Sequence, residues 1–435
     1  MDLKTWATGG FEGFKGVWDF EDFWKRSNTF HAFLCFVDAA EQNWPGDPEV
    51  GDMSSLRNDM IDGNSSFFDK YIGGPSVWCD DYGWCGISCL AAYDYLRWVG
   101  DDDRAGVYLA RAERCWEQML QVGYDATDQA RPVPHGCGNI SPDRKKTPQD
   151  YGTKNTVTNT NLLLLSLRLY NAVRGTDPTR AARYLSMAHA QYQWFSTWFL
   201  DEYQSEDDGH YLRRMPGPMF LIHERPMAKP DYLKKDFPTW QPGWVWTGDQ
   251  GLLLAGMVEL LLVGDDLLAW TSANQVPGFD PAKFENSIGD VITSLVAGMS
   301  SLFVAPDKVL REPPFSSSFG IEYGLDYVGG RGVLLRYVSE KSVQRALGGR
   351  FNPSGIAATA EAVWNSCESE NQFDSLWNKA NDSVFNKNFV DWWGSGDIGI
   401  TEWELGSDLK SKKVRGVVQA TGLDALTAAM RYNLT

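Results

Sequence analysis

Apolar residues recur at helical spacing along almost the whole chain. Ten segments follow this pattern, at residues 18–43, 84–99, 103–121, 155–173, 179–201, 249–264, 281–303, 325–346, 356–385 and 415–432. No stretch alternates convincingly between apolar and polar residues in the way that marks the strands of a sheet. The sequence therefore predicts an all-α protein, with room for two further short helices.

The predicted helices are of two kinds. Residues 161–170 (NLLLLSLRLY) and 252–263 (LLLAGMVELLLV) are apolar nearly all round and need burial on every side, whereas residues 103–121 carry one apolar stripe against a charged face. Such alternation predicts two concentric layers of helical hairpins closed into a ring, the (α/α)6 toroid. No linker interrupts the pattern, so we expect a single domain over residues 1–435. The longest predicted loop, 202–247, is expected to be functional.

Composition and charge restrict the partners. The net charge of −17 disfavours nucleic acids and anionic membranes, and no apolar run reaches the ~20 residues that cross a bilayer. The seven cysteines have no regular spacing and are expected to be free thiols. The first residues lack the features of a secretory signal, which predicts a cytoplasmic protein, or a secreted one if the sequence given has been trimmed. The expected partner is a carbohydrate or another small molecule, and nothing in the sequence indicates an oligomeric state.

The strongest candidate for chemistry is the pair Asp80 and Asp81, in the segment VWCDDYGWCGISCL. Two carboxyl groups held close cannot both ionise freely, so one can act as an acid and the other as a base or nucleophile. Trp78, Tyr82 and Trp84 surround the pair and could exclude water and stack on a sugar ring. The alternative is that both aspartates only cap the start of a helix.

Two further helix starts carry polar residues that could bind substrate. Trp246, Asp249 and Gln250 precede the apolar helix at 252, and Asn155 and Asn159 precede the one at 161. Capping explains each of them singly. Amide side chains nevertheless both donate and accept hydrogen bonds, as ligands of sugar hydroxyls must.

Other chemistries lack support in the sequence. The five histidines show no paired spacing, and the cysteines at 79, 85 and 89 have no second pair of zinc ligands. The segment GGRG at 329–332 lacks the Lys-Ser/Thr of a phosphate-binding loop. No metal and no cofactor is expected.

Five segments, taken together and in order, resemble glycoside hydrolase family 76: the aromatic-rich DD segment at 77–90, and residues 154–170, 246–251, 331–337 and 419–426. The resemblance implies an (α/α)6 barrel and retaining endo-α-1,6-mannanase or transglycosylase activity. It assigns the nucleophile to Asp80 and the acid/base to Asp81. Retaining enzymes of this kind hold the two carboxyl groups ~5 to 5.5 Å apart.

Three functions follow from these residues. The first is a retaining glycosidase or transglycosylase that acts on α-linked mannose or a similar sugar. The second is a cytoplasmic enzyme of small-molecule metabolism that uses the same pocket for an acid-base cyclisation or isomerisation; the family's aromatic segment before residue 154 is replaced here by HGCGNI at 135–140. The third is a carbohydrate-binding protein without catalysis.

Overall fold

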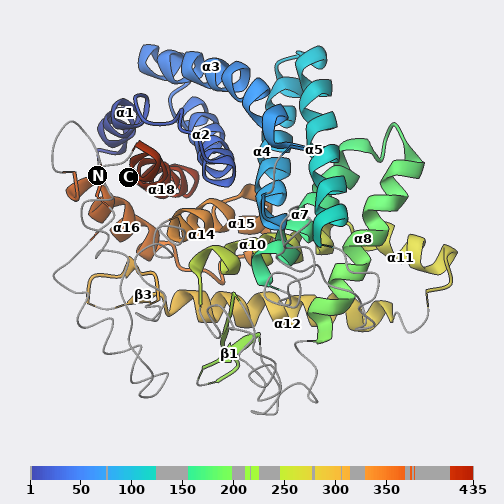
Figure 1. Ribbon diagram of the computed structural model, residues 1–435. Coiled ribbons are helices and arrows are strands. Elements are labelled where there is room, and N and C mark those ends of the chain that lie inside the picture. Colours follow the sequence, from blue (N-terminus) through green and yellow to red (C-terminus); the bar gives the residue numbers. More distant parts are fainter. Residues whose placement is uncertain are drawn as a thin grey trace, which may run out of the picture.

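The structure is a computed structural model, and it describes residues 2–74, 77–123, 155–197, 211–215, 217–224, 245–276, 280–304, 306–313, 329–367, 373–374, 377 and 412–434. Everything below concerns these residues. The helices that they form are arranged in two layers around one axis (Figure 1).

The inner layer is a closed ring of helices, each in contact with the next. The last member, α18, packs against the first, α2. In ring order the members are α2 (Phe23–Asn43), α4 (Cys79–Trp98), α7 (Thr156–Val173), α10 (Thr247–Leu262), α14 (Gly330–Val338) and α18 (Lys412–Arg431).

The outer layer covers this ring. α3 (Pro48–Tyr71) packs on α2, α5 (Asp102–Gly123) on α4, α8 (Pro178–Thr197) on α7 and α12 (Pro281–Ser300) on α10. Both α1 (Leu3–Phe14) and α16 (Ser354–Asn365) pack on α18. The first helix of the chain thus lies against the last and closes the toroid. Two short helices, α11 (Gly264–Ala273) and α15 (Lys341–Leu347), complete the described set. The predicted (α/α)6 architecture is confirmed.

The two segments predicted to be buried all round are inner helices. In α7, residues 162–165 are fully buried leucines, and in α10 residues 252–255 are fully buried. Gly251 explains how α10 comes so close to its neighbour, because a Cβ at this position would lie 2.7 Å from the Cα of Leu334 in α14.

Several element boundaries differ from the prediction. Helices α1, α3 and α11 were not predicted, and α4 begins five residues earlier than residue 84. The predicted helix 325–346 is two helices, α14 and α15, separated at residues 339–340. The expectation of no strands is wrong in two places, where β1 (Leu212–Arg214) pairs antiparallel with β2 (Phe220–Ile222) and β3 (Phe303–Val304) with β4 (Val309–Leu310).

The missed helix α3 shows why propensity misled the prediction. Its glycines, serines and asparagines are poor helix formers. Its buried residues nevertheless recur at helical spacing, through Val50, Met53, Met60 and Phe67, and they pack on the ring. Tertiary burial therefore overrides weak local preference.

All inner helices run in the same direction. Residues from the late turns of α2, α4, α7, α10 and α18, together with residues just after α14, line a single cavity at one end of the ring. Their first turns must therefore lie at the other end, which we call the N-terminal mouth. None of the helices in the described ranges has the length and apolar character that a membrane span requires.

Candidate active site

The aspartate pair lies in the first turn of α4, at the N-terminal mouth. Asp81 is 8% exposed, and its Oδ2 accepts a hydrogen bond of 3.2 Å from the backbone N–H of Trp78, the residue that precedes the helix. The capping interpretation thus holds for one oxygen of Asp81. Asp80 is half-buried, and its charge acts on Asp249 at the start of α10. The ring therefore brings together two of the predicted site residues that are far apart in the sequence.

Asp249 is enclosed by other acidic groups. Its side chain is fully buried in the first turn of α10. Burial raises the pKa of Asp249 well above its ordinary value, and the charge of Glu224, a hydrogen bond shared with Glu224, and the charges of Glu312 and Asp80 raise it further. The protonated form of Asp249 is therefore favoured, and in that form its O–H can donate a hydrogen bond to the Glu224 carboxylate.

Glu224 and Glu312 belong to this site, and the sequence interpretation missed both. Glu224 follows β2, and its carboxylate accepts from the Asn155 side chain (2.9 Å) and the Val157 backbone N–H (3.1 Å) at the start of α7. Glu312 follows β4 and accepts from the backbone N–H of Thr247 (2.7 Å) at the start of α10. Each glutamate thus occupies the positive end of an inner helix, where a carboxylate is stabilised.

A shared pattern could have revealed these glutamates. Residues 221–226 read LIHERP and residues 309–314 read VLREPP. In both, two apolar residues precede a basic residue or histidine, then Glu, one further residue and Pro. The apolar pair contributes to a short strand in each case, and the glutamate follows where the strand has ended.

The predicted amide ligands are held by the protein itself. Asn155 binds Glu224, and the Asn159 side chain donates to the Asn155 carbonyl at 2.8 Å. Gln250 accepts from the Ile222 N–H (2.9 Å) and donates to the carbonyls of Ile222 (2.8 Å) and Trp246 (2.9 Å). One N–H of Gln250 thus holds β2 against α10, and the other binds the residue that precedes α10. Direct contact of these amides with substrate stays a prediction.

The predicted aromatic residues divide between the core and the mouth. Tyr82 is fully buried, and its ring lies edge-on to Phe23 with centroids 5.9 Å apart. Trp78 is half-buried at the helix start. Trp84 packs edge-on against Trp246, with centroids 6.0 Å apart. The pair Trp84 and Trp246 joins the start of α4 to that of α10, so it positions Asp80 relative to Asp249.

The arrangement is suited to acid-base chemistry. Asp80 is the most exposed carboxyl group of this cluster, whereas Asp249, whose protonated form is favoured, is fully buried. The described residues hold no group of three or more His, Cys, Asp and Glu side chains that could bind a metal ion.

The chain has the fold of the six-hairpin α/α toroid proteins, since its helical hairpins form a closed ring. Carboxyl groups gather at the first turns of the inner helices. The sequence matches no protein-family profile and no curated protein. Its similarity to known proteins lies in solved structures.

Three of these are similar over nearly their full lengths. A Listeria innocua protein has a TM-score of 0.57 at 14% identity, covering 100% of this chain and 98% of its own. A family 76 glycoside hydrolase (mannosidase) of Bacteroides thetaiotaomicron has a TM-score of 0.55 at 13% identity, covering 100% of both chains. The third is an inactive variant of the α-1,6-mannanase GH76A of Salegentibacter sp., in complex with α-1,6-mannotetrose. It has a TM-score of 0.50 at 15% identity, covering 98% of this chain and 100% of its own. The chain has a fold like that of family 76 glycoside hydrolases.

Proposed function

We propose that this chain is a retaining glycoside hydrolase or transglycosylase that acts on α-linked mannose-type sugars through Asp80 and Asp81. One observation carries the proposal: adjacent carboxyl groups open a helix of a family-76-like toroid, and one of them faces a further cluster of acids. In the α-1,6-mannanase of Salegentibacter, the inactive variant has two neighbouring aspartates replaced. That protein binds α-1,6-mannotetrose, which suggests the substrate class here.

The reaction would take place in two steps. A carboxylate oxygen of Asp80 attacks the anomeric carbon, while Asp81 gives its proton to the departing glycosidic oxygen. Asp81 then removes a proton from water or a sugar hydroxyl, which displaces Asp80 and restores both groups. The raised pKa of Asp249 favours its neutral form, so the negative charge around Asp80 is lower than four ionised carboxyl groups would give.

The proposal is tested by measuring reducing ends released from α-1,6-mannan by the wild type and single variants. Asp80→Asn and Asp81→Asn should each lower kcat/KM at least ~1000-fold, about 4 kcal/mol of transition-state stabilisation, with little change in stability. Asp103→Asn is the matched control, since Asp103 belongs to another aspartate pair, is exposed and also lies in the first turn of a helix. Equal activity of all three variants would contradict the proposal.

Inactivity of the folded wild type on every mannan and mannoside would instead favour the metabolic enzyme. The acidic mouth also supports this second function, because a protonated Asp249 beside ionised carboxylates could donate a proton to a substrate without a sugar.

A further inference from the structure

The opposite end of the toroid contains a cavity that the proposed reaction does not use. Its volume is about 760 Å³, within the range of small-molecule sites. It is lined by the late turns of the inner helices and by the residues after α14, whereas Asp80 and Asp249 lie in first turns. The charged pair Arg336 and Asp424 is fully buried in the ring, with 2.8 and 2.6 Å between donor and acceptor atoms, and Arg336 also contacts His31 of the cavity wall.

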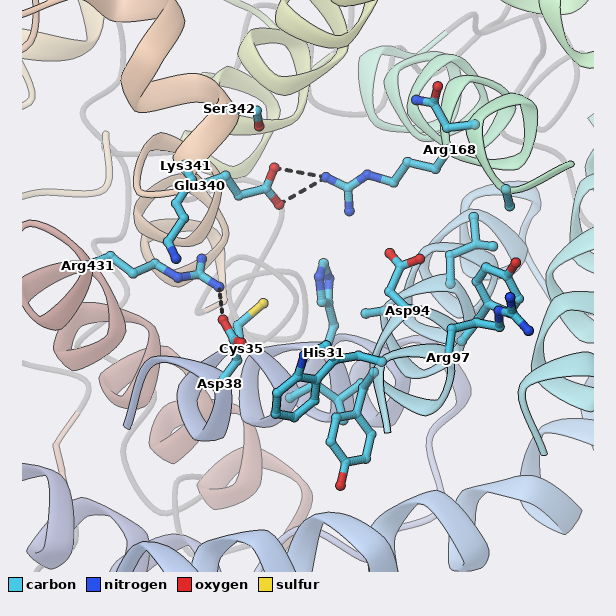
Figure 2. Close-up of a pocket in the computed structure, with 18 of the residues that line it drawn as sticks. His31, Cys35, Asp38, Asp94, Arg97, Arg168, Glu340, Lys341, Ser342 and Arg431 are labelled. Atoms are coloured by element: carbon cyan, nitrogen blue, oxygen red, sulfur yellow. Dashed lines mark hydrogen bonds and ion pairs between the residues drawn. The ribbon is translucent and has the colours of Figure 1, made fainter. Parts of the chain in front are cut away.

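The cations of this cavity already have partners. Arg168 donates to both carboxylate oxygens of Glu340, each at 2.9 Å (Figure 2). It also donates to Glu259 at 2.9 Å. Arg57 donates to both oxygens of Glu41, at 2.7 and 2.9 Å. Since these two guanidinium groups are neutralised by carboxylates, they offer no free charge to an anionic ligand.

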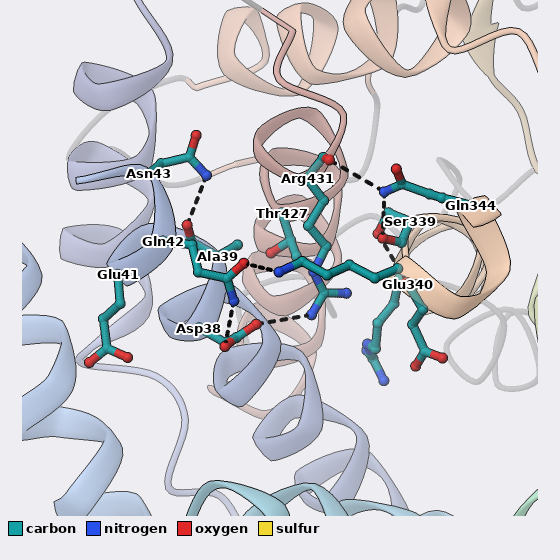
Figure 3. A network of polar contacts seen from close by, with 12 residues as sticks. Asp38, Ala39, Glu41, Gln42, Asn43, Ser339, Glu340, Gln344, Thr427 and Arg431 are labelled. Carbon is teal, nitrogen blue, oxygen red and sulfur yellow. Dashed lines mark hydrogen bonds and ion pairs between the residues drawn. The ribbon is translucent and has the colours of Figure 1, made fainter. Parts of the chain in front are cut away.

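The rim near α18 combines one ion pair with hydrogen bonds to an amide. Arg431 lies 3.7 Å from Asp38 (Figure 3). The Lys341 ammonium group donates to the side-chain oxygen of Gln42, at 2.5 Å. Gln42 in turn donates to Asp38 at 2.8 Å. Donors and acceptors are therefore mixed around the wall, as a ligand with many hydroxyl groups requires.

A carboxyl group and one ring nitrogen face the cavity without a hydrogen bond to another described residue. Among the described residues no hydrogen bond or ion pair reaches Asp94, whose carboxyl group points into the cavity (Figure 2). His31 is only 3% exposed, and its ring also points inward. Its Nδ1 lies 3.2 Å from Arg336, which can only donate, so Nδ1 accepts and Nε2 carries the hydrogen. The cavity thus presents one free acceptor group and one free N–H donor.

An exposed aromatic ring lies beside the free acceptor. Trp98 lines the cavity and is 75% exposed, the largest fraction among the exposed large hydrophobic residues of the described chain. Asp94 and Trp98 are four residues apart on α4 and therefore lie on one side of the helix. A flat ring next to a carboxylate can stack on the C–H face of a sugar while the carboxylate accepts from its hydroxyls.

We propose that this cavity is a second, non-catalytic binding site for a neutral mono- or disaccharide, which stacks on Trp98 and hydrogen-bonds to Asp94 and His31. The proposal does not rest on the catalytic function, because none of its residues takes part in the proposed reaction.

The test is amide hydrogen exchange of the full chain with mass spectrometry, in the presence of maltose, α-1,6-mannobiose, putrescine or inorganic phosphate. The sugars should slow exchange in residues 93–99 and 339–346, and putrescine and phosphate should not. Trp98→Ala and Asp94→Asn should each weaken the sugar-induced protection at least tenfold in apparent affinity. Leu262→Ala, which removes another exposed apolar side chain, should leave it unchanged.

Absence of protection at saturating sugar, or protection by putrescine or phosphate alone, would overturn the proposal. Its failure is separable from that of the proposed function. Trp98→Ala should keep full mannan-hydrolysing activity, and Asp80→Asn should keep the protection at 93–99. A wild type without hydrolytic activity that still shows this protection would reject the proposed reaction and support the second site.

Discussion

The two ends of the toroid differ in the partners of their acidic residues. At the N-terminal mouth the charges of Asp80, Glu224 and Glu312 act on Asp249 and favour its protonated form. At the other end the acids pair with guanidinium groups, as Glu259 and Glu340 do with Arg168. The helix dipole accounts for part of this difference. It favours carboxylates at the first turns and cations at the last turns of the same helices.

The comparison shows where this fold is stabilised and where it is strained. Mutual repulsion of acids at the mouth lowers stability but produces perturbed protonation, which is typical of catalytic sites. Pairing at the far end removes that cost. Removing an acid from the mouth should therefore raise the free energy of unfolding, whereas breaking an ion pair at the far end should lower it.

The largest effect is expected from Arg168→Met. It leaves Glu259 and Glu340 without their cation in a largely buried position, so the free energy of unfolding should fall by about 3 kcal/mol or more. Urea denaturation measures the loss. The control is Arg174→Met, which breaks an exposed pair with Asp266 near the end of the same helix and should cost less than ~1 kcal/mol. Similar losses in both variants would show that the far end does not depend on its ion pairs.

Asp249→Asn should change the free energy of unfolding in the opposite direction. Asparagine is neutral and nearly isosteric, so the free energy of unfolding of the variant should exceed that of the wild type by about 1 to 2 kcal/mol at pH 7. The raised pKa fixes the pH dependence: the wild type loses stability as pH rises above the unfolded value of 3.8, so the gain should vanish below that pH. Thermal denaturation at pH 7 and at pH 3.5 measures it. A variant less stable than the wild type at pH 7 would contradict the account of the mouth.

The smallest effect is expected from Asp94→Asn. Burial raises the pKa of Asp94 to about 6; the charge of Arg168 opposes this rise, and the charge of Glu340 adds to it. Two further titratable groups line the cavity, Glu259 and His31, and burial lowers the pKa of His31. Ionisation therefore costs stability between pH 3.8 and about 6, and asparagine removes that cost. Since the side chain is exposed to the cavity, the gain above pH 6 should be only about 1 kcal/mol, with none near pH 3.5. A gain that is the same at both pH values would exclude titration of Asp94 as its cause.

The sequence predicted the architecture because the inner helices have an unambiguous signature. Runs such as residues 161–170 can be stable only when buried on all sides, and the ring provides that burial. Helix α1 was missed because Gly9, Gly10 and Gly13 lower its helix propensity. The close approach to α18 explains one of them, since a Cβ on Gly10 would lie 3.1 Å from Leu423.

The candidate site was predicted only in part. Asp80 and Asp249 could be recognised because each begins a helix beside aromatic residues. Glu224 and Glu312 lie after short strands whose pairing depends on distant segments, so helical spacing carried no information about them. The role of Gln250 in holding β2 likewise depends on a contact with Ile222 that only the folded chain reveals. The far cavity was missed because it is assembled from the ends of all the inner helices.

The most direct test of the catalytic role of the mouth is to trap the covalent intermediate. The wild type is incubated with an activated 2-fluoro-mannosyl substrate, digested and analysed by tandem mass spectrometry. The account predicts one fluoromannosyl group, attached to Asp80. Attachment to another carboxyl group such as Glu224, or no attachment in an enzyme that turns over mannosides, would contradict it.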